Sequence, residues 1–221
     1  MKATKIAASL EQLLTELSHS TMKFSQGDKF DEFVQRNIIG PLTVKAEAWK
    51  NEECYREARL AIKADNNNGV VQLNTAIDAF VLIDKPNGAQ CWPDTLLLEG
   101  QVGVCLEYKS SKEGKVVWNS GLPRPSGIYL IHAYGKSNKL THRTSFFLGE
   151  DAISDIETRL MIDGRKNLEV ANKTLLGELE KLKSKWSLYV RPMHNWNVNP
   201  VTDSSRVQRE NRVFEFLKLL K

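Results

Sequence analysis

Apolar residues near the start of the chain recur every three or four positions. One stripe consists of Ile6, Leu10, Leu13, Leu14 and Leu17, with Glu11 and Glu16 between them. This spacing predicts an amphipathic helix over 3–18, and a similar pattern predicts a second helix over 28–38. The helix over 3–18 has two interpretations: it packs on its own core, or it forms the interface of a dimer.

The pattern changes in the middle of the chain to short apolar runs rich in β-branched and aromatic residues, separated by Gly, Pro and Asn. These runs predict strands over 76–84, 94–100, 102–109, 127–135 and 144–149. A polar loop over 62–70 precedes them. Asn87-Gly88 marks a turn after the first strand, and the sequence EGQVG predicts a tight turn that pairs the second strand with the third.

The last third of the chain returns to helical spacing. We expect a helix over 166–185, a strand at 187–192, a polar loop and a final helix over 206–220. This order predicts an α/β (α+β) fold, in which helices flank a mixed, mostly antiparallel central sheet. We expect one domain over 1–221, with a helical N-terminal region over 1–60, a sheet core at about 76–149 and a helical C-terminal region over 150–221.

Composition narrows the class of protein. With 41% hydrophobic and 26% charged residues, the chain is an ordinary globular protein rather than a disordered one. No apolar run reaches the length of a membrane span, and the start of the chain does not resemble a signal peptide, so we expect a cytoplasmic protein without membrane partners. Three cysteines and four histidines are scattered, which argues against disulfides and structural zinc. The net charge of +4 is compatible with a polyanionic partner.

Three charged residues stand out in the predicted sheet. Asp94 begins the second strand, while Glu107 and Lys109 lie two apart on the third and therefore share a face. Pairing of the two strands brings all three side chains to one point. Two carboxylates there repel each other, and Mg²⁺ suits such hard oxygen ligands. A lysine beside the metal can activate or position a water, which suits phosphodiester hydrolysis. The alternative interpretation is a surface ion pair of Glu107 with Lys109, next to a turn at Asp94.

Pro93-Asp94, followed after twelve residues by Glu107-Tyr108-Lys109, resembles the motif of the PD-(D/E)xK nuclease superfamily. The resemblance covers about 76–133. It implies a restriction-endonuclease-like core with Mg²⁺ held by Asp94 and Glu107, the Leu106 carbonyl as a further ligand, and Lys109 assisting the attacking water. Many members carry an extra acid on a preceding helix, for which Asp31 and Glu32 are candidates. In size, and in lacking helicase or ATPase motifs, the chain looks like a small type II restriction endonuclease. GIYLIHAYG at 127–135 begins like the GIY-YIG nuclease motif but lacks its second triplet.

Such an enzyme would bind double-stranded DNA, and polar and basic residues near the motif are candidates for that contact. Amides and arginines read base edges, and basic residues bind phosphates. The candidates are Ser110, Ser111, Lys112, Asn119, Ser120, Arg124, Arg143, Arg191, His194, Asn195 and Asn197. For the loop 191–200, turns that satisfy their own backbone explain the amides equally well. A palindromic site would imply a homodimer, and a restriction enzyme would work beside a cognate DNA methyltransferase without a stable complex.

Other functions remain open at this stage. A structure-selective repair or junction nuclease would use the same residues but would need a more basic channel than a net charge of +4 supplies. A non-catalytic nucleic-acid-binding or protein-binding module would bind without metal dependence. A small-molecule enzyme lacks support, because the chain carries no phosphate-binding loop, nucleophile elbow or metal-ligand helix.

Overall fold

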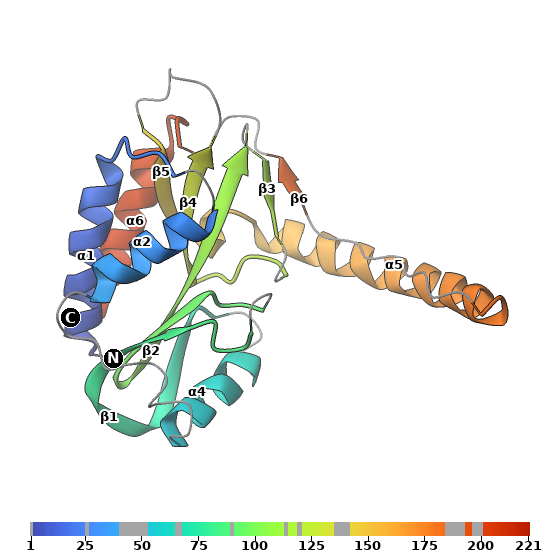
Figure 1. Cartoon of the computed structure of the whole chain (residues 1–221), viewed down its shortest axis with the longest axis horizontal. Helices are drawn as coiled ribbons and strands as arrows, with labels where there is room; N and C mark the ends of the chain where they lie inside the picture. The colour runs from blue at the N-terminus through green and yellow to red at the C-terminus, as the bar shows by residue number, and fades with distance from the viewer. Residues whose placement is uncertain are drawn as a thin grey trace.

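The structure is a computed structural model. It describes residues 2–24, 27–39, 53–64, 68–88, 91–112, 115–118, 121–134, 142–183, 193–195 and 201–221. Its helices are α1 (Thr4–Ser18), α2 (Gly27–Ile39), α4 (Glu53–Ala64), α5 (Asp155–Lys181) and α6 (Arg206–Leu219), with a short 3₁₀ turn at Gly149–Asp151 (Figure 1). Its strands are β1 (Val70–Asp84), β2 (Thr95–Lys112), β3 (Lys115–Val117), β4 (Ile128–Tyr134), β5 (Thr144–Leu148) and β6 (Met193–Asn195).

The strands form one mixed sheet. Its order is β5-β4-β2-β3-β6, and β1 pairs with β2 outside this path. Only β2 and β4 run parallel among the described pairs, with Glu107 opposite Tyr129 and Lys109 opposite Ile131. The prediction of a mixed, mostly antiparallel sheet with helical flanks is therefore confirmed.

Strand β2 folds back on itself. A straight strand rises about 3.3 Å per residue, which would separate Asp94 from Glu107 by about 43 Å. The Asp94 N–H instead donates to Glu107 Oε2 at 3.1 Å. The reversal lies near Gly100, whose φ of 60° is in the left-handed region that favours glycine. At Gly103, an added Cβ would lie 3.0 Å from a Leu98 side-chain atom, so the two halves are adjacent. The predicted hairpin is therefore wrong: β2 is continuous through EGQVG, both of its halves pair with β1, and a sharp bend brings the halves together.

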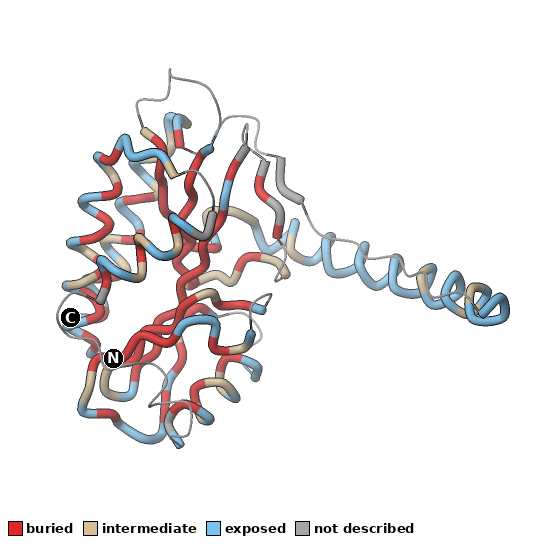
Figure 2. The backbone as a smooth tube through the Cα atoms, in the orientation of Figure 1, coloured by how far each residue is buried: buried red, intermediate tan, exposed pale blue. Residues whose placement is uncertain are grey.

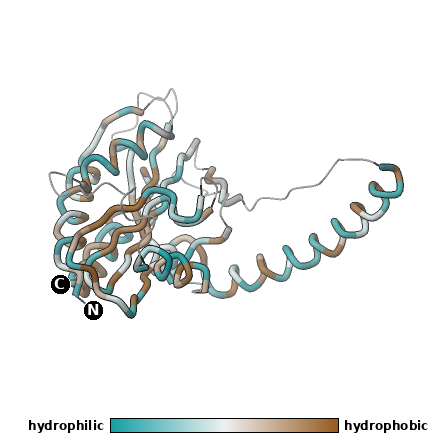
Figure 3. The backbone as a smooth tube through the Cα atoms, turned by 60° about the horizontal axis from the view of Figure 1, so that its bottom comes forward, coloured by the Kyte–Doolittle hydropathy of each residue, from teal (hydrophilic) through white to brown (hydrophobic). Residues whose placement is uncertain are grey.

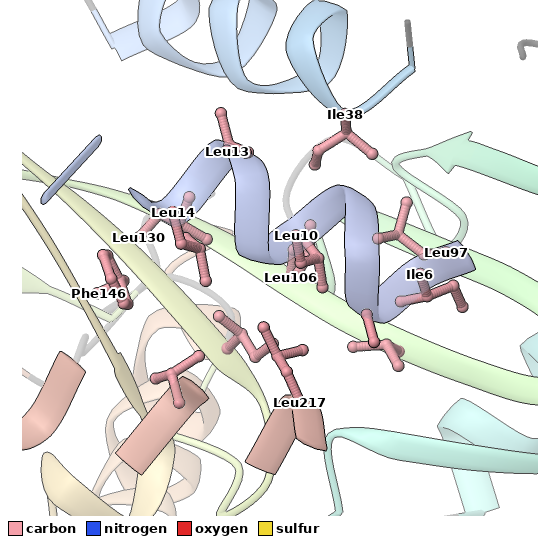
Figure 4. Packing of buried hydrophobic residues seen from close by; sticks show 14 of the residues in the cluster. Ile6, Leu10, Leu13, Leu14, Ile38, Leu97, Leu106, Leu130, Phe146 and Leu217 are labelled. Atoms are coloured by element: carbon pink, nitrogen blue, oxygen red, sulfur yellow. The ribbon is translucent and has the colours of Figure 1, made fainter. Parts of the chain in front are cut away.

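The main core lies between the sheet and three helices. The apolar stripe of α1 is fully buried, and Figure 4 shows its leucines against Leu106 and Leu130 of the sheet, with Leu217 of α6 beside them. The ends of the chain meet here, since the Ala3 N–H donates to the Leu220 carbonyl at 2.6 Å. Of the two interpretations of the first helix, packing on its own core is therefore the one observed.

Two smaller cores complete the molecule. One packs α4 against β1 and the first half of β2, and includes Trp92. The other lies on the opposite face of β4 and β5 from the main core. It contains Trp118, Tyr129, Ile131, Phe147 and Val201. Because side chains alternate along a strand, Glu107 and Lys109 share this second face, while Leu106 and Tyr108 face the main core.

Several predicted boundaries are wrong. The predicted loop at 62–70 holds the end of α4 and the start of β1. The helix expected over 166–185 begins at Asp155, where the Ser154 hydroxyl and Glu157 form a capping box. The expected loop at 191–200 contains strand β6, which pairs with β3. The strand expected at 187–192 lies outside the described residues. Among the helices described, none is both long and apolar enough to cross a membrane.

Candidate active site

Asp94 is held in place by its backbone and its side chain together. It follows a cis peptide bond between Trp92 and Pro93 and directly precedes β2. Its carbonyl accepts from the Lys85 N–H at 2.7 Å, and its carboxylate accepts from the Tyr108 N–H at 2.8 Å. The carboxylate is therefore fixed against the second half of β2, beside Glu107.

Glu107 and Lys109 form a buried ion pair. Lys109 Nζ lies 2.6 Å from Glu107 Oε1, and the two side chains are only 8% exposed for the lysine and 3% for the glutamate. The ammonium also lies 5.6 Å from the centre of the Trp118 ring, a cation–π distance. Asp94, Glu107 and Lys109 thus come together as the sequence predicted. The alternative of an exposed surface pair does not fit this burial.

The carboxyl of Asp94 lies in an unfavourable electrostatic environment. Burial, followed by the charge of Glu107, raises the pKa of Asp94 from 3.8 to about 6, although the Tyr108 N–H and Lys109 lower it. A carboxyl whose ionisation costs free energy in the folded state contributes nothing to folding at neutral pH. A cation bound between the two carboxylates would relieve this repulsion.

A second group of polar side chains lies near Asp94, on the face of β2 that carries Tyr108. The Tyr108 hydroxyl donates to Thr95 Oγ1 at 2.8 Å. Gln35 of α2 donates to Thr95 Oγ1 at 3.1 Å and to Asp84 Oδ1 at 2.7 Å. Sequence reasoning missed Gln35, Asp84 and Thr95. The position of Asp84 at the end of the strand that leads into the turn before Asp94 was the available signal.

Two aromatic residues, Trp92 and Tyr129, connect Arg124 to the site. Its guanidinium is 5.5 Å from the centre of the Trp92 ring, and its backbone N–H donates to the Tyr129 hydroxyl at 2.7 Å. Tyr129 is the register partner of Glu107, and burial and then the charge of Glu107 raise its pKa. Lys85, also missed from the sequence, is exposed beside Asp94. The charge of Lys85 acts on Asp94, and that of Arg124 acts on Tyr129.

The remaining predicted catalytic and metal-binding residues are placed as follows. Leu106 precedes Glu107 in β2 and its side chain is in the main core, so only its carbonyl is available to a metal. Glu32 is exposed and pairs with Lys29 at 3.1 Å. Asp31 is partly buried and acts electrostatically on Tyr108. Of the two predicted acids, Asp31 is thus the one that acts on a residue of the site strand, but on the Tyr108 face of β2.

Two of the predicted DNA contacts are wrong, because their side chains are buried. Ser111 is 0% exposed and Arg143 is 3% exposed, so neither side chain faces the surface. Ser110 is exposed, and Arg124 is partly exposed. The backbone places Lys112 at the end of β2 and His194 and Asn195 in β6. The other four predicted contacts lie outside the described residues: Asn119, Ser120, Arg191 and Asn197.

The donor set fits Mg²⁺ better than zinc. Among the described residues, no three His, Cys, Asp or Glu side chains cluster as a metal site. Zinc sites in proteins take three or four such ligands, whereas Mg²⁺ is often held by one or two carboxylates together with waters and substrate phosphates. Asp94 and Glu107 would supply those two carboxylates, with backbone and lysine bonds that fix their orientation.

No protein-family model, curated protein or solved structure compared with this chain matches it. The assignment of this site therefore depends on its own geometry.

Proposed function

We propose that the protein is a Mg²⁺-dependent, sequence-specific endonuclease for double-stranded DNA, with the activity of a type II restriction enzyme. It would hydrolyse phosphodiester bonds to 5′-phosphate and 3′-hydroxyl ends. The observation that carries this proposal is the meeting of Asp94, directly before β2, with Glu107 in the second half of β2, where Lys109 is bound to Glu107 at 2.6 Å. This arrangement agrees with the resemblance to the PD-(D/E)xK superfamily.

Each side chain has a role that its surroundings support. Asp94 and Glu107 would hold the metal, with the Leu106 carbonyl as a further ligand. Mg²⁺, when bound, supplies Lewis-acid stabilisation to the scissile phosphate. Lys109 is kept at the Glu107 carboxylate by its ion pair and by the Trp118 ring, where it can orient the attacking water or stabilise the pentavalent phosphate.

The environment of Asp94 favours catalysis over a non-catalytic binding module. A module that only binds DNA gains nothing from a partly buried carboxyl whose pKa is raised to about 6 next to a second carboxylate. Such a carboxyl would also repel a DNA phosphate unless a cation lay between them. Lys85, whose charge acts on Asp94, and Arg124 would contact phosphates near the cleaved bond.

The cellular setting follows from the proposed activity. The enzyme would act in the cytoplasm on foreign DNA, as a homodimer if its site is palindromic, beside a methyltransferase that protects the host sequence. A structure-selective repair or junction nuclease is the second candidate, and it would use the same three residues. The cleavage pattern separates the two.

The test is incubation of plasmid and phage DNA with the protein, in Mg²⁺ and in EDTA. Asp94→Asn is the informative variant, because the amide can still accept the Tyr108 N–H but no longer carries the charge that binds metal. Asp78→Asn is the matched control, since Asp78 is an exposed carboxyl in β1. We expect discrete fragments with the wild type and the control, and none with Asp94→Asn or in EDTA.

The other outcomes decide between the alternatives. A metal-dependent smear would favour the structure-selective or nonspecific nuclease. DNA that is bound but intact in every lane would favour the non-catalytic module, and salt dependence of that binding would identify phosphate contacts. DNA that is neither bound nor cut, across several substrates, would refute the proposal.

A further inference from the structure

Helix α4 carries all of its basic residues on one side. Arg59 and Lys63 follow Arg56 by three and seven residues, so the three side chains leave the helix within about 60° of one another. Arg56 and Lys63 are exposed and Arg59 is half-buried. Figure 2 shows exposed and buried residues alternating along α4, whose apolar side packs on β1. Arg56, Arg59 and Lys63 therefore form a basic stripe at the surface.

The basic stripe has no acidic partner within the described part of the chain. None of its three cations forms an ion pair there, whereas all four cations of α6 do. Glu57 lies on the other flank of α4, where its carboxylate accepts from the backbone N–H groups of Asn74 and Thr75. Glu53 begins the helix, where an acid stabilises the helix dipole. The charge of the stripe is therefore not neutralised by contact with an acid.

The stripe adjoins the turn that holds Asp94. The Arg59 guanidinium lies 5.6 Å from the centre of the Tyr55 ring, and the Tyr55 hydroxyl donates to the Pro86 carbonyl at 3.1 Å. Pro86 directly follows Lys85, whose N–H donates to the Asp94 carbonyl at 2.7 Å. A continuous set of contacts thus connects the basic side of α4 to the candidate active site.

We propose that the basic stripe and Lys85 bind successive phosphates of one DNA strand next to Asp94. This inference rests on the proposed nuclease function and identifies a part of its DNA-binding surface that the sequence did not indicate. From Arg56 to Lys63 the helix rises about 10 Å. One strand of B-DNA presents a phosphate about every 3.4 Å along its axis, so this length matches about three phosphates.

The aromatic contact of Arg59 suits this role. A guanidinium that is already held over a ring loses less side-chain freedom when it binds a phosphate. Arg124 has the same arrangement over Trp92, and Trp92 packs in the same small core as Tyr55. Two arginines stacked on aromatic rings of one core therefore lie on the part of the molecule that carries the turn before Asp94.

The test compares two triple variants that lose the same charge. The first is Arg56→Gln, Arg59→Gln and Lys63→Gln, in which glutamine keeps the helix propensity. The control replaces Arg165, Lys166 and Lys181 of α5 by glutamine, because each of these cations pairs with an acid. Figures 1 and 3 show α5 extending away from the sheet.

The first measurement is the affinity for a fluorescently labelled DNA duplex in EDTA, by anisotropy at salt concentrations from about 50 to 200 mM. Each phosphate contact contributes about 0.9 to the slope of log K against log salt. We expect the slope of the α4 triple variant to be smaller than that of the wild type by about 2 to 3, and the slope of the control to be unchanged. Arg56→Gln with Lys63→Gln keeps Arg59 on its ring, so this double variant tests the stripe without disturbing that packing, and its slope should fall by about 1.8.

The second measurement is DNA cleavage in Mg²⁺. Contacts to phosphates beyond the cleaved bond bind substrate and transition state alike. The α4 triple variant should therefore raise KM about tenfold or more and leave kcat unchanged.

Failure of this inference is distinguishable from failure of the nuclease proposal. If the wild type cuts DNA while the α4 variants keep its salt slope and KM, the inference is overturned and the nuclease proposal stands. An equal effect of the α5 control would also overturn it, because the effect would then come from net charge alone. A wild type that neither binds nor cuts DNA would overturn both proposals.

Discussion

Replacing Asp94 by asparagine should stabilise the metal-free protein at neutral pH. The pKa of Asp94 is raised from 3.8 to about 6 by burial and by Glu107, so keeping this carboxyl ionised in the folded state costs free energy. Each pKa unit corresponds to about 1.36 kcal/mol, so the substitution should increase the free energy of unfolding by about 2 to 3 kcal/mol. The amide retains an acceptor for the Tyr108 N–H, which limits other losses.

The raised pKa of Asp94 determines how the stability of the wild type changes with pH. Between pH 4 and pH 6 folded wild-type protein holds a proton on Asp94 that the unfolded chain has released. Wild-type stability therefore falls through this window as the pH rises. Asp94→Asn lacks the titration. The difference in stability between the two proteins should be near zero at pH 4 and reach its full size near pH 7.

The assay is urea denaturation followed by tryptophan fluorescence from pH 4 to pH 8, with Asp78→Asn as the control. Mg²⁺ at about 100 times its dissociation constant should stabilise the wild type by about 2.7 kcal/mol and leave Asp94→Asn nearly unchanged. If Asp94→Asn is less stable than the wild type at pH 7, or if the difference does not vary with pH, the electrostatic account of the site is wrong.

Four further substitutions test the buried ion pair, a hydrogen bond beside it and two glycines, each by denaturation of the purified variant. Lys109→Ala leaves the carboxylate of Glu107 buried without its lysine and should lower the free energy of unfolding by about 3 kcal/mol; an unchanged stability would contradict the buried ion pair. Tyr108→Phe removes the bond to Thr95 at a cost of about 1 to 2 kcal/mol but keeps the N–H that binds Asp94. DNA cleavage by this variant at permissive temperature should persist, and its loss would give the hydroxyl a catalytic role. Gly69→Ala places a Cβ 1.9 Å from the Gly127 nitrogen and should cost roughly 2 kcal/mol or more. By contrast, the Cβ added by Gly177→Ala in α5 meets nothing within 4 Å, so this variant should be more stable than the wild type by up to about 1 kcal/mol. If Gly69→Ala were the more stable of the two variants, the environments assigned to these glycines would be wrong.

Local patterns were sufficient for much of the fold. The stripe of α1, the apolar runs of β4 and β5 and the final helix α6 were predicted within one or two residues, because each element has one face or both faces in a core. The common face of Glu107 and Lys109 followed from strand geometry alone. The resemblance to a nuclease motif identified Asp94 as their partner, and the structure brings these three residues together.

Only the tertiary structure decided what surrounds those residues. Burial of the Lys109–Glu107 pair depends on Trp118, which arrives from the end of β3, and Gln35 reaches the neighbourhood of Asp94 from α2, about sixty residues earlier. Burial also removed Ser111 and Arg143 from the predicted DNA contacts, because alternation along β2 and packing beside β5 turn them inward. The first turns of α5 were missed because none of their residues is buried in a core, and the capping box at Ser154 starts the helix there. A sequence specifies local periodicity directly. The burial of a charged side chain, and the partners that it contacts, depend instead on which distant elements pack over it.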